Sequence, residues 1–159
     1  MSFQYTIRAL LPSEGSILRR FTYEAIFKRP TDSDVPFSIV DKAELRCYWE
    51  DFDKFASDFC LVAETGGQIV GACWVRNIQG YGNISPEVPE LALAILEEHR
   101  SKGIGTALMN RLIADLKELG IPRISLAVQK DNYALRLYQN VGFTNIGETD
   151  EEWLMELRL

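Results

Sequence analysis

The sequence predicts a single α/β domain over residues 1–159, with a mixed central sheet of about seven strands and helices on both faces. The length of 159 residues fits one domain, because domains hold roughly 100–200 residues. Hydrophobic residues make up 47% of the chain and charged residues 25%, which is typical of globular proteins. Segments with strand periodicity alternate with segments with helix periodicity, and the strand–helix–strand unit around residues 90–128 requires a right-handed crossover.

The N-terminal third of the chain predicts an edge strand followed by helices. Residues 3–10 alternate enough between apolar and polar side chains to indicate a strand. Pro12 then begins a helix whose apolar residues recur at helical spacing as far as Ile26. Residues 29–36 are rich in turn formers, and a helical segment is expected from there to about Ala56.

Two short apolar runs, at residues 59–63 and 69–75, predict a β-hairpin. The segment between them contains a Gly-Gly pair, which can adopt the positive φ of a tight turn. Residues 79–89 contain two glycines and two prolines and are expected to be irregular. Residues 90–95 follow as a buried strand.

The remaining chain predicts a long helix, a strand, a short helix and two closing strands. Apolar residues recur at helical spacing from Ile104 to Leu119, and Gly120 and Pro122 end this helix. The further elements are a strand at 123–128, a short helix capped by Asp131 or Asn132 that reaches Asn140, and strands at 144–148 and 153–159. The final strand could pair with a second copy of the chain, so a homodimer is one alternative for the assembly.

The composition argues against several classes of protein. A net charge of −6 opposes binding to phosphate backbones, so we expect no nucleic-acid partner. No apolar run approaches the ~20 residues of a membrane helix and no secretory leader is visible, so we expect no membrane partner and a cytoplasmic location. Cys47, Cys60 and Cys73 lie thirteen residues apart and only one histidine is present, which indicates buried thiols and no metal site.

Residues 100–106 (RSKGIGT) join the buried strand to the long helix and predict an anion site. Unpaired backbone N–H groups and the positive end of the helix dipole converge at a helix N-terminus. Gly103 and Gly105 let a ligand approach the backbone closely, and Arg100 and Lys102 add positive charge. The alternative is that these glycines only shape a tight turn.

Two other phosphate-binding motifs do not fit this loop. A Rossmann fingerprint requires a third glycine at the position that Leu108 occupies, and a P-loop requires Gly-Lys-Ser/Thr, which the chain lacks. A nucleotide-binding enzyme of either kind is therefore disfavoured.

Two motifs resemble those of the GCN5-related N-acetyltransferase (GNAT) family. Arg100 to Gly105 matches the family's acyl-CoA signature, Arg/Gln-x-x-Gly-x-Gly/Ala, which follows a strand and precedes a long helix. The segment 132–143 (NYALRLYQNVGF) is similar to the family's second motif. The chain departs from the family at Glu97, where proline is frequent, and at Ala127, where some members carry an acidic base. The resemblance implies a GNAT fold and acetyl-CoA as the acyl donor.

The resemblance also implies roles for individual residues. The backbone of Leu93, Ala94 and Ile95 would pair with the pantetheine arm of acetyl-CoA, and Asn132 would contact the same arm. Tyr138 would contact the cofactor and act as general acid, because a phenol with a pKa of about 10 is protonated at neutral pH and can donate to a thiolate. The pyrophosphate would lie against Arg100, Ser101, Lys102, Gly103, Ile104, Gly105 and Thr106.

Glu90 is the candidate for the base that receives the amine's proton, whereas His99 is not. Glu90 opens the strand that leads to the site and could accept the proton directly or through water. The alternative for Glu90 is an ordinary strand-end carboxylate, with the proton lost to solvent. His99 precedes Arg100 in a loop where a solvated side chain is expected, and we assign it no catalytic role.

The resemblance implies an acetyl-CoA-dependent N-acetyltransferase that moves an acetyl group directly to a primary amine of a small molecule or peptide. The alternative is a module of the same fold that binds or senses acyl-CoA without turnover. The acceptor should contact residues 12–56 and 79–89, which carry no recognisable code. Candidate pocket residues, most of them expected to pack in the core, are Phe27, Tyr48, Trp49, Trp74, Arg76 and Tyr81.

Overall fold

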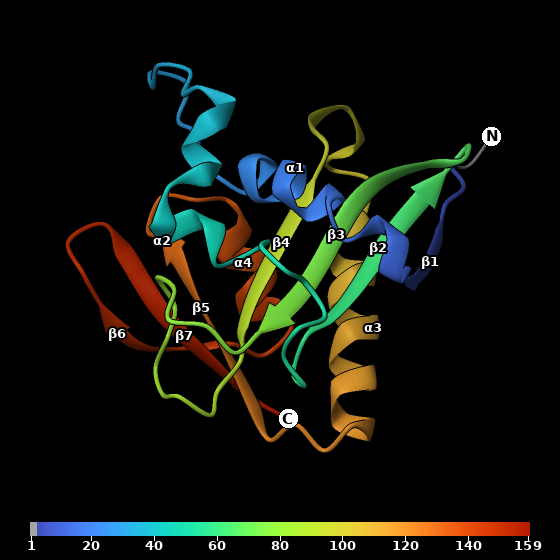
Figure 1. Cartoon of the computed structure of the whole chain (residues 1–159). Helices are drawn as coiled ribbons and strands as arrows, with labels where there is room; N and C mark the ends of the chain where they lie inside the picture. The colour runs from blue at the N-terminus through green and yellow to red at the C-terminus, as the bar shows by residue number, and fades with distance from the viewer. Residues whose placement is uncertain (1–2) are drawn as a thin grey trace.

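The computed structural model describes residues 3–159 and contains a seven-stranded sheet in the order β1-β2-β3-β4-β5-β7-β6 (Figure 1). Its strands are β1 (Thr6–Ala9), β2 (Phe59–Thr65), β3 (Gln68–Arg76), β4 (Glu90–Ile95), β5 (Arg123–Gln129), β6 (Thr144–Glu148) and β7 (Glu152–Arg158). The α-helices are α1 (Ile17–Glu24), α2 (Ala43–Arg46), α3 (Ile104–Glu118) and α4 (Ala134–Asn140), and short 3-10 helices are η1 (Pro12–Glu14), η2 (Phe37–Asp41) and η3 (Glu97–His99). Because β4 and β5 are parallel while the other neighbours are antiparallel, the predicted mixed α/β sheet is confirmed.

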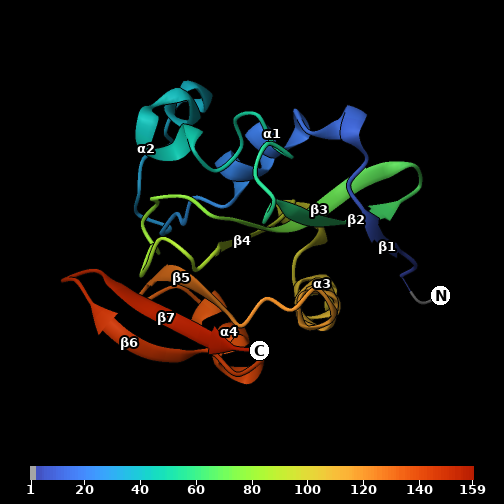
Figure 2. The ribbon, with the colours of Figure 1, turned by 60° about the horizontal axis from the view of Figure 1, so that its bottom comes forward.

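Helices cover both faces of the sheet, as Figure 2 shows. Helix α1 packs on β3 and β4 from one face, and α3 packs on β2, β3 and β4 from the other. The apolar stripe of α3 is fully buried at Leu108, Leu112 and Leu116. Removing each such side chain from water contributes about 1.5–3 kcal/mol, so this helix is held by its packing face.

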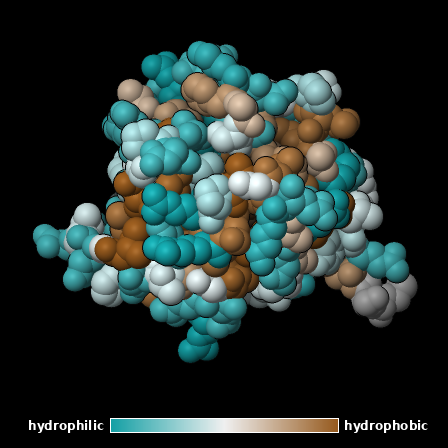
Figure 3. Space-filling view, turned by 90° about the horizontal axis from the view of Figure 1, so that it is seen from below, coloured by the Kyte–Doolittle hydropathy of each residue, from teal (hydrophilic) through white to brown (hydrophobic). Residues whose placement is uncertain are grey.

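One face of the molecule carries apolar residues in small groups (Figure 3). On the face seen in Figure 3, hydrophobic patches are separated by polar side chains. Such scattered exposure is normal for a folded protein and does not by itself mark an interface. Among residues 3–159, no helix is both long and apolar enough to cross a membrane.

Glycines with positive φ form the boundaries that the sequence predicts. The β2–β3 hairpin turns at Gly66 and Gly67, whose φ angles are 57° and 79°. Helix α3 begins after Gly103 at φ 82° and is followed by Gly120 at φ 78°. Because left-handed backbone is unfavourable for residues with a Cβ, these four positions favour glycine for conformational reasons.

The segment between residues 37 and 58 corrects the prediction of a helix reaching Ala56. It contains only the short η2 and the single turn of α2, followed by turns. The Arg76 side chain is buried against Asp58, with Nε to Oδ1 at 3.0 Å, and its guanidinium draws in carbonyl groups that a continuing helix would use. The accepting carbonyls are those of Cys47, Glu50 and Asp51, at 2.7–3.2 Å. The buried Arg76–Asp58 pair and the carbonyl groups bound to Arg76 therefore favour turns over a continuous helix in this segment.

The position of β7 corrects the expectation that the final strand could pair with a second copy. β7 lies between β5 and β6 and is paired on both edges. The edge strands of the sheet are β1 and β6.

The three thiols differ in exposure. Cys60 and Cys73 are buried, as expected, whereas Cys47 is only half-buried. Burial raises the pKa of all three thiols. In the part of the chain that the structure describes, no cluster of three or more His, Cys, Asp or Glu residues could hold a metal ion.

Candidate functional site

The parallel strands β4 and β5 form a split in the sheet. They pair only at Glu90 and Ser125, and beyond this pair they diverge (Figure 1). β4 continues to Ile95 against β3, and β5 continues to Gln129 against β7. The edge of residues 91–95 that faces β5 consequently has no strand partner within residues 3–159. Its backbone groups can pair with an extended ligand.

A cleft of about 1300 Å³ lies at the wide end of this split. Its walls come from residues 23–35, which begin in the last turn of α1, and from the N-terminal parts of α3 and α4. The predicted site residues that line it are Leu93, Ala94, Ile95, Arg100, Ser101, Gly103, Ile104, Gly105, Thr106, Asn132 and Tyr138. Segments far apart in the sequence are thus brought to one cavity. Lys102 and Glu90 are not among its lining residues.

The start of α3 presents backbone donors to the cleft. The first α-helical bond of α3 runs from the N–H of Ala107 to the carbonyl of Gly103, at 3.1 Å. The N–H groups of the three preceding residues, 104–106, have no helical acceptor. Ser101 has a φ of 61°, a left-handed conformation that non-glycine residues adopt rarely, and it helps to turn this loop around the helix end.

The basic residues of the loop make contacts of their own. Arg100 donates from Nε to the carbonyl of Ile95 at 2.9 Å and from Nη2 to the carbonyl of Glu24 at 3.4 Å, so it ties β4 to α1. The Nζ atom of Lys102 lies 4.5 Å from the centre of the Phe3 ring, which draws this side chain to the outside of the loop.

The sequence predicts a solvated His99 side chain, but the structure shows a half-buried one. Its ring lies 5.7 Å from that of Phe3 and is half-buried. Its Nδ1 atom is buried without a hydrogen-bond partner in residues 3–159. The N-terminal segment covers this side of the loop, which sequence periodicity could not reveal.

Asn132 lies just before α4, and Tyr138 lies in the helix itself. The side-chain oxygen of Asn132 accepts a hydrogen bond from the N–H of Ala134 at 2.9 Å and so forms a turn that leads into α4, whose N-cap is Tyr133. Tyr138 is 9% exposed and meets the Phe143 ring edge-to-face at 5.9 Å. Burial raises the pKa of the Tyr138 phenol, which therefore stays protonated at neutral pH. No hydrogen bond to its hydroxyl is found among the described residues.

Glu90 lies at the narrow end of the split and is 3% exposed. Its carboxylate accepts hydrogen bonds from the Tyr48 hydroxyl at 2.8 Å, the N–H of Gly80 at 2.8 Å and the N–H of Gly82 at 3.1 Å. Burial raises the pKa of Glu90, and these three donors oppose the rise by stabilising the charged form. A carboxylate has about four acceptor positions, so one remains free on Oε1.

Sequence reasoning missed an ion pair across the cleft. Arg29 in the first wall donates to Asp131 at 2.6 and 2.9 Å, and Asp131 precedes Asn132 in the other wall. The two residues are 102 positions apart, so no local pattern could have paired them. Of the six candidate pocket residues, Phe27 alone lines the cleft, while Trp74 and Arg76 are buried.

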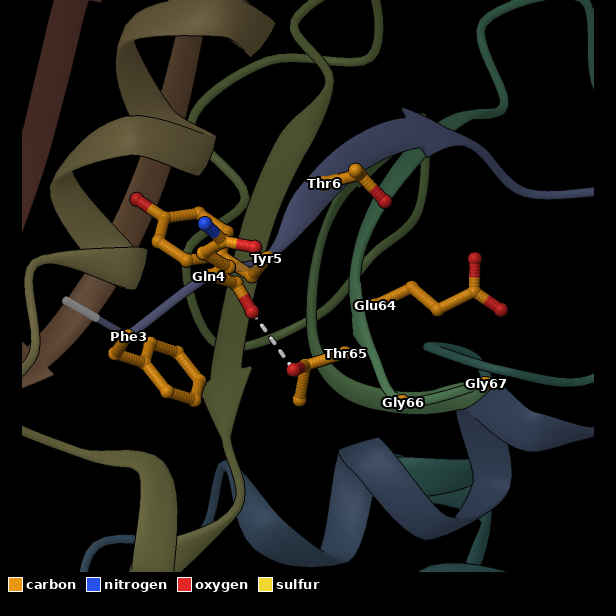
Figure 4. A pocket seen from close by; sticks show the side chains of 8 residues that line it. All are labelled: Phe3, Gln4, Tyr5, Thr6, Glu64, Thr65, Gly66 and Gly67. Carbon is orange, nitrogen blue, oxygen red and sulfur yellow. Dashed lines mark hydrogen bonds between the residues drawn. The ribbon is translucent and has the colours of Figure 1, made fainter. Parts of the chain in front are cut away.

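A second depression, of about 620 Å³, lies between residues 3–6 and 64–67 (Figure 4). There the Thr65 hydroxyl donates to the carbonyl of Gln4 at 2.8 Å. None of the predicted site residues lines it. The cleft at the split is therefore the candidate site.

Comparison with known proteins assigns the family. Residues 23–143 match the model of the acetyltransferase (GNAT) family. Mycothiol acetyltransferase from Sanguibacter keddieii is 33% identical over 147 residues, which cover 87% of this chain and 43% of that protein. N-acetyltransferase family 8 member 3 from Mus musculus is 32% identical over 98 residues, covering 61% and 43%. The chain spans about half the length of the curated relatives it matches.

Solved structures share the fold. The paia N-acetyltransferase from Thermoplasma acidophilum, in complex with coenzyme A, has a TM-score of 0.70 at 19% identity and covers 99% of this chain and 100% of that chain. YncA from Salmonella typhimurium, with its cofactor acetyl-CoA, has a TM-score of 0.68 at 20% identity, covering 99% and 95%. The protein has an α/β fold in which the mixed sheet splits between β4 and β5, beside the N-terminus of α3. The chain belongs to the acetyltransferase (GNAT) family.

Proposed function

We propose that this protein is an N-acetyltransferase that uses acetyl-CoA to acetylate a primary amine of a small molecule or peptide by direct transfer. The observation that carries the proposal is the free edge of residues 91–95 beside the unpaired N–H groups of 104–106, in one cleft with Tyr138. The edge suits the amide-bearing pantetheine arm, and the helix start suits the pyrophosphate. The solved relatives that hold coenzyme A or acetyl-CoA support this choice of donor.

In this proposal, backbone groups of β4 and of the loop 100–106, together with the side chain of Asn132, bind the donor. Leu93, Ala94 and Ile95 pair with the pantetheine arm, and an N–H in this stretch polarises the thioester carbonyl as negative charge develops on its oxygen. Asn132 contacts the same arm. The loop 100–106 surrounds the pyrophosphate, with Lys102 supplying long-range positive charge from the outer side of the loop.

Tyr138 is the proposed general acid. When the amine nitrogen forms its bond to the acetyl carbon and the carbon–sulfur bond breaks, the departing thiolate needs a proton, and the Tyr138 hydroxyl donates it. The raised pKa of this buried phenol keeps the proton available. The absence of a protein partner for the hydroxyl among residues 3–159 leaves it free to face the sulfur.

Glu90 is the proposed acceptor of the amine's proton. Because Glu90 lies at the narrow end of the split and not on the cleft wall, the proton reaches it through water. The free acceptor position on Oε1 is the one that such a water would use. The amine must lose this proton to expose the lone pair that attacks the acetyl carbon.

Release of free thiol from acetyl-CoA in the presence of a panel of small amines and peptides tests the function. Turnover with at least one amine, lost in Tyr138→Phe, is the expected result. Binding of acetyl-CoA without turnover on the panel would favour the alternative of a module that senses acyl-CoA. The absence of acetyl-CoA binding in calorimetry would contradict both.

A further inference from the structure

Residues 80–82 lie where β4 and β5 part and are hydrogen-bonded to both strands. The N–H groups of Gly80 and Gly82 donate to the Glu90 carboxylate on β4, at 2.8 and 3.1 Å. The carbonyl of Gly82 accepts a hydrogen bond from the Ser125 hydroxyl on β5, at 2.6 Å. Glu90 and Ser125 are themselves the residues through which β4 and β5 pair. This short segment is thus fastened to both members of the last pair before the split.

The packing of the two glycines leaves no room for side chains. A Cβ on Gly82 would lie 2.7 Å from the backbone N of Ala127 and the backbone C of Leu126, which are β5 residues beyond the pair. A Cβ on Gly80 would lie 2.3 Å from the Tyr48 hydroxyl oxygen. The backbone of Gly82 therefore rests directly against β5, and that of Gly80 against Tyr48 and Glu90, at the narrow end of the split.

Tyr48 holds residues 80–82 against the start of β4 by hydrogen bonds. Its hydroxyl donates to Glu90 Oε2 at 2.8 Å and accepts from the N–H of Tyr81 at 2.9 Å. The backbone of Tyr48 is held in turn, because its carbonyl accepts a hydrogen bond from the indole N–H of Trp74 at 2.9 Å. One hydroxyl thus joins the 80–82 segment, the start of β4 and the loop after α2.

We propose that residues 80–82 act as a wedge that sets the separation of β4 and β5, and that Tyr48 and Ser125 are positioning residues for acetyl-CoA because they hold this wedge from its two sides. The inference rests on the proposed function, in which the donor pairs with the edge of residues 91–95. A loosened wedge lets β4 and β5 change their spacing, and the free edge then no longer matches its ligand.

Tyr48→Phe and Ser125→Ala test the wedge, with Thr22→Val as a matched control. Thr22 is buried and its hydroxyl donates to the carbonyl of Leu18 at 2.7 Å, so the control also removes one buried hydrogen bond, but one within helix α1. Hydrogen exchange of the free protein should become faster at residues 91–95 and 126–128 in both test variants and not in the control. Gly80→Ala should reproduce this result by displacing the Tyr48 hydroxyl.

Calorimetry and kinetics with acetyl-CoA measure the consequence for binding. We expect the affinity to fall and the KM for acetyl-CoA to rise by about tenfold in Tyr48→Phe and Ser125→Ala, as for loss of one buried hydrogen bond. The change in kcat should be smaller in Ser125→Ala, whose hydroxyl bonds to Gly82 and not to Glu90. Faster exchange confined to residues 79–83, with unchanged affinity, would overturn the proposal. If the parent protein binds no acetyl-CoA, the proposed function fails, while exchange at 91–95 and 126–128 still decides whether the wedge sets the strand spacing.

Discussion

A pair of substitutions at the two ends of α3 tests the phosphate site most directly. Gly103 precedes the helix with φ 82° and Gly120 follows it with φ 78°. A Cβ at either position would lie in open space. A side chain at either glycine therefore costs about 1–2 kcal/mol of backbone strain without a steric clash. Because this cost is the same at both positions, a difference in acetyl-CoA affinity between Gly103→Glu and Gly120→Glu arises from the position of the new carboxylate.

We expect Gly103→Glu to weaken acetyl-CoA binding by about tenfold or more and Gly120→Glu to leave it unchanged. Gly103 lines the cleft, whereas Gly120 does not. Two unit charges about 6 Å apart at an effective dielectric constant of about 40 repel by about 1.4 kcal/mol, which is about tenfold in affinity. A pyrophosphate carries more than one charge, so this value is a lower bound.

Isothermal titration calorimetry with acetyl-CoA measures both affinities, and thermal melting verifies that both variants are folded. The difference between them should shrink when the salt concentration is raised to 1 M, because the Debye length then falls to about 3 Å. Equal affinities for the two folded variants would refute the assignment of the pyrophosphate to the start of α3.

Three further predictions concern the acid, the base and the buried ion pair. Tyr138→Phe should lower kcat by about 10²–10⁴-fold with little change in acetyl-CoA affinity, and an unchanged kcat under rate-limiting chemistry would exclude Tyr138 as the acid. Because a base must be ionised and burial raises the pKa of Glu90, kcat/KM should rise with pH through that raised pKa. Glu90→Gln should lower the high-pH plateau of kcat/KM or move the rise towards the pKa of the amine. If the pH profiles of the parent and Glu90→Gln superimpose, the proton goes to another group. Asp58→Asn should lower the free energy of unfolding by about 3–5 kcal/mol in urea titrations, because it leaves the buried Arg76 guanidinium without its counter-charge, and a loss below about 1 kcal/mol would contradict that role.

The parts of the fold that the sequence predicted are those determined by near neighbours. Helix α3 was predictable because its apolar stripe and the glycines at 103 and 120 lie within one short segment. The hairpin of β2 and β3 was predictable from its Gly-Gly turn for the same reason. The segment from residue 37 to 58 was not, since its carbonyl groups are directed by Arg76 on a distant strand.

The candidate site shows the same division. The loop 100–106 and Asn132 to Tyr138 carry recognisable patterns, and the fold brings them to one cleft. The outward position of Lys102 depends on the ring of Phe3, and the seclusion of Glu90 depends on Tyr48 and the 80–82 segment. These contacts join residues remote in sequence, so periodicity and spacing could not indicate them.

The interior position of β7 limits how copies of this chain can associate through their sheets. The outer edges of the sheet belong to β1, with four residues, and to β6, with five, whereas β5 and β7 pair over seven positions. β6 also carries an irregularity in its pairing between Asn145 and Gly147. Intermolecular strand addition at either outer edge would therefore form only a short ladder, which disfavours extended β-aggregates that grow through these two edges.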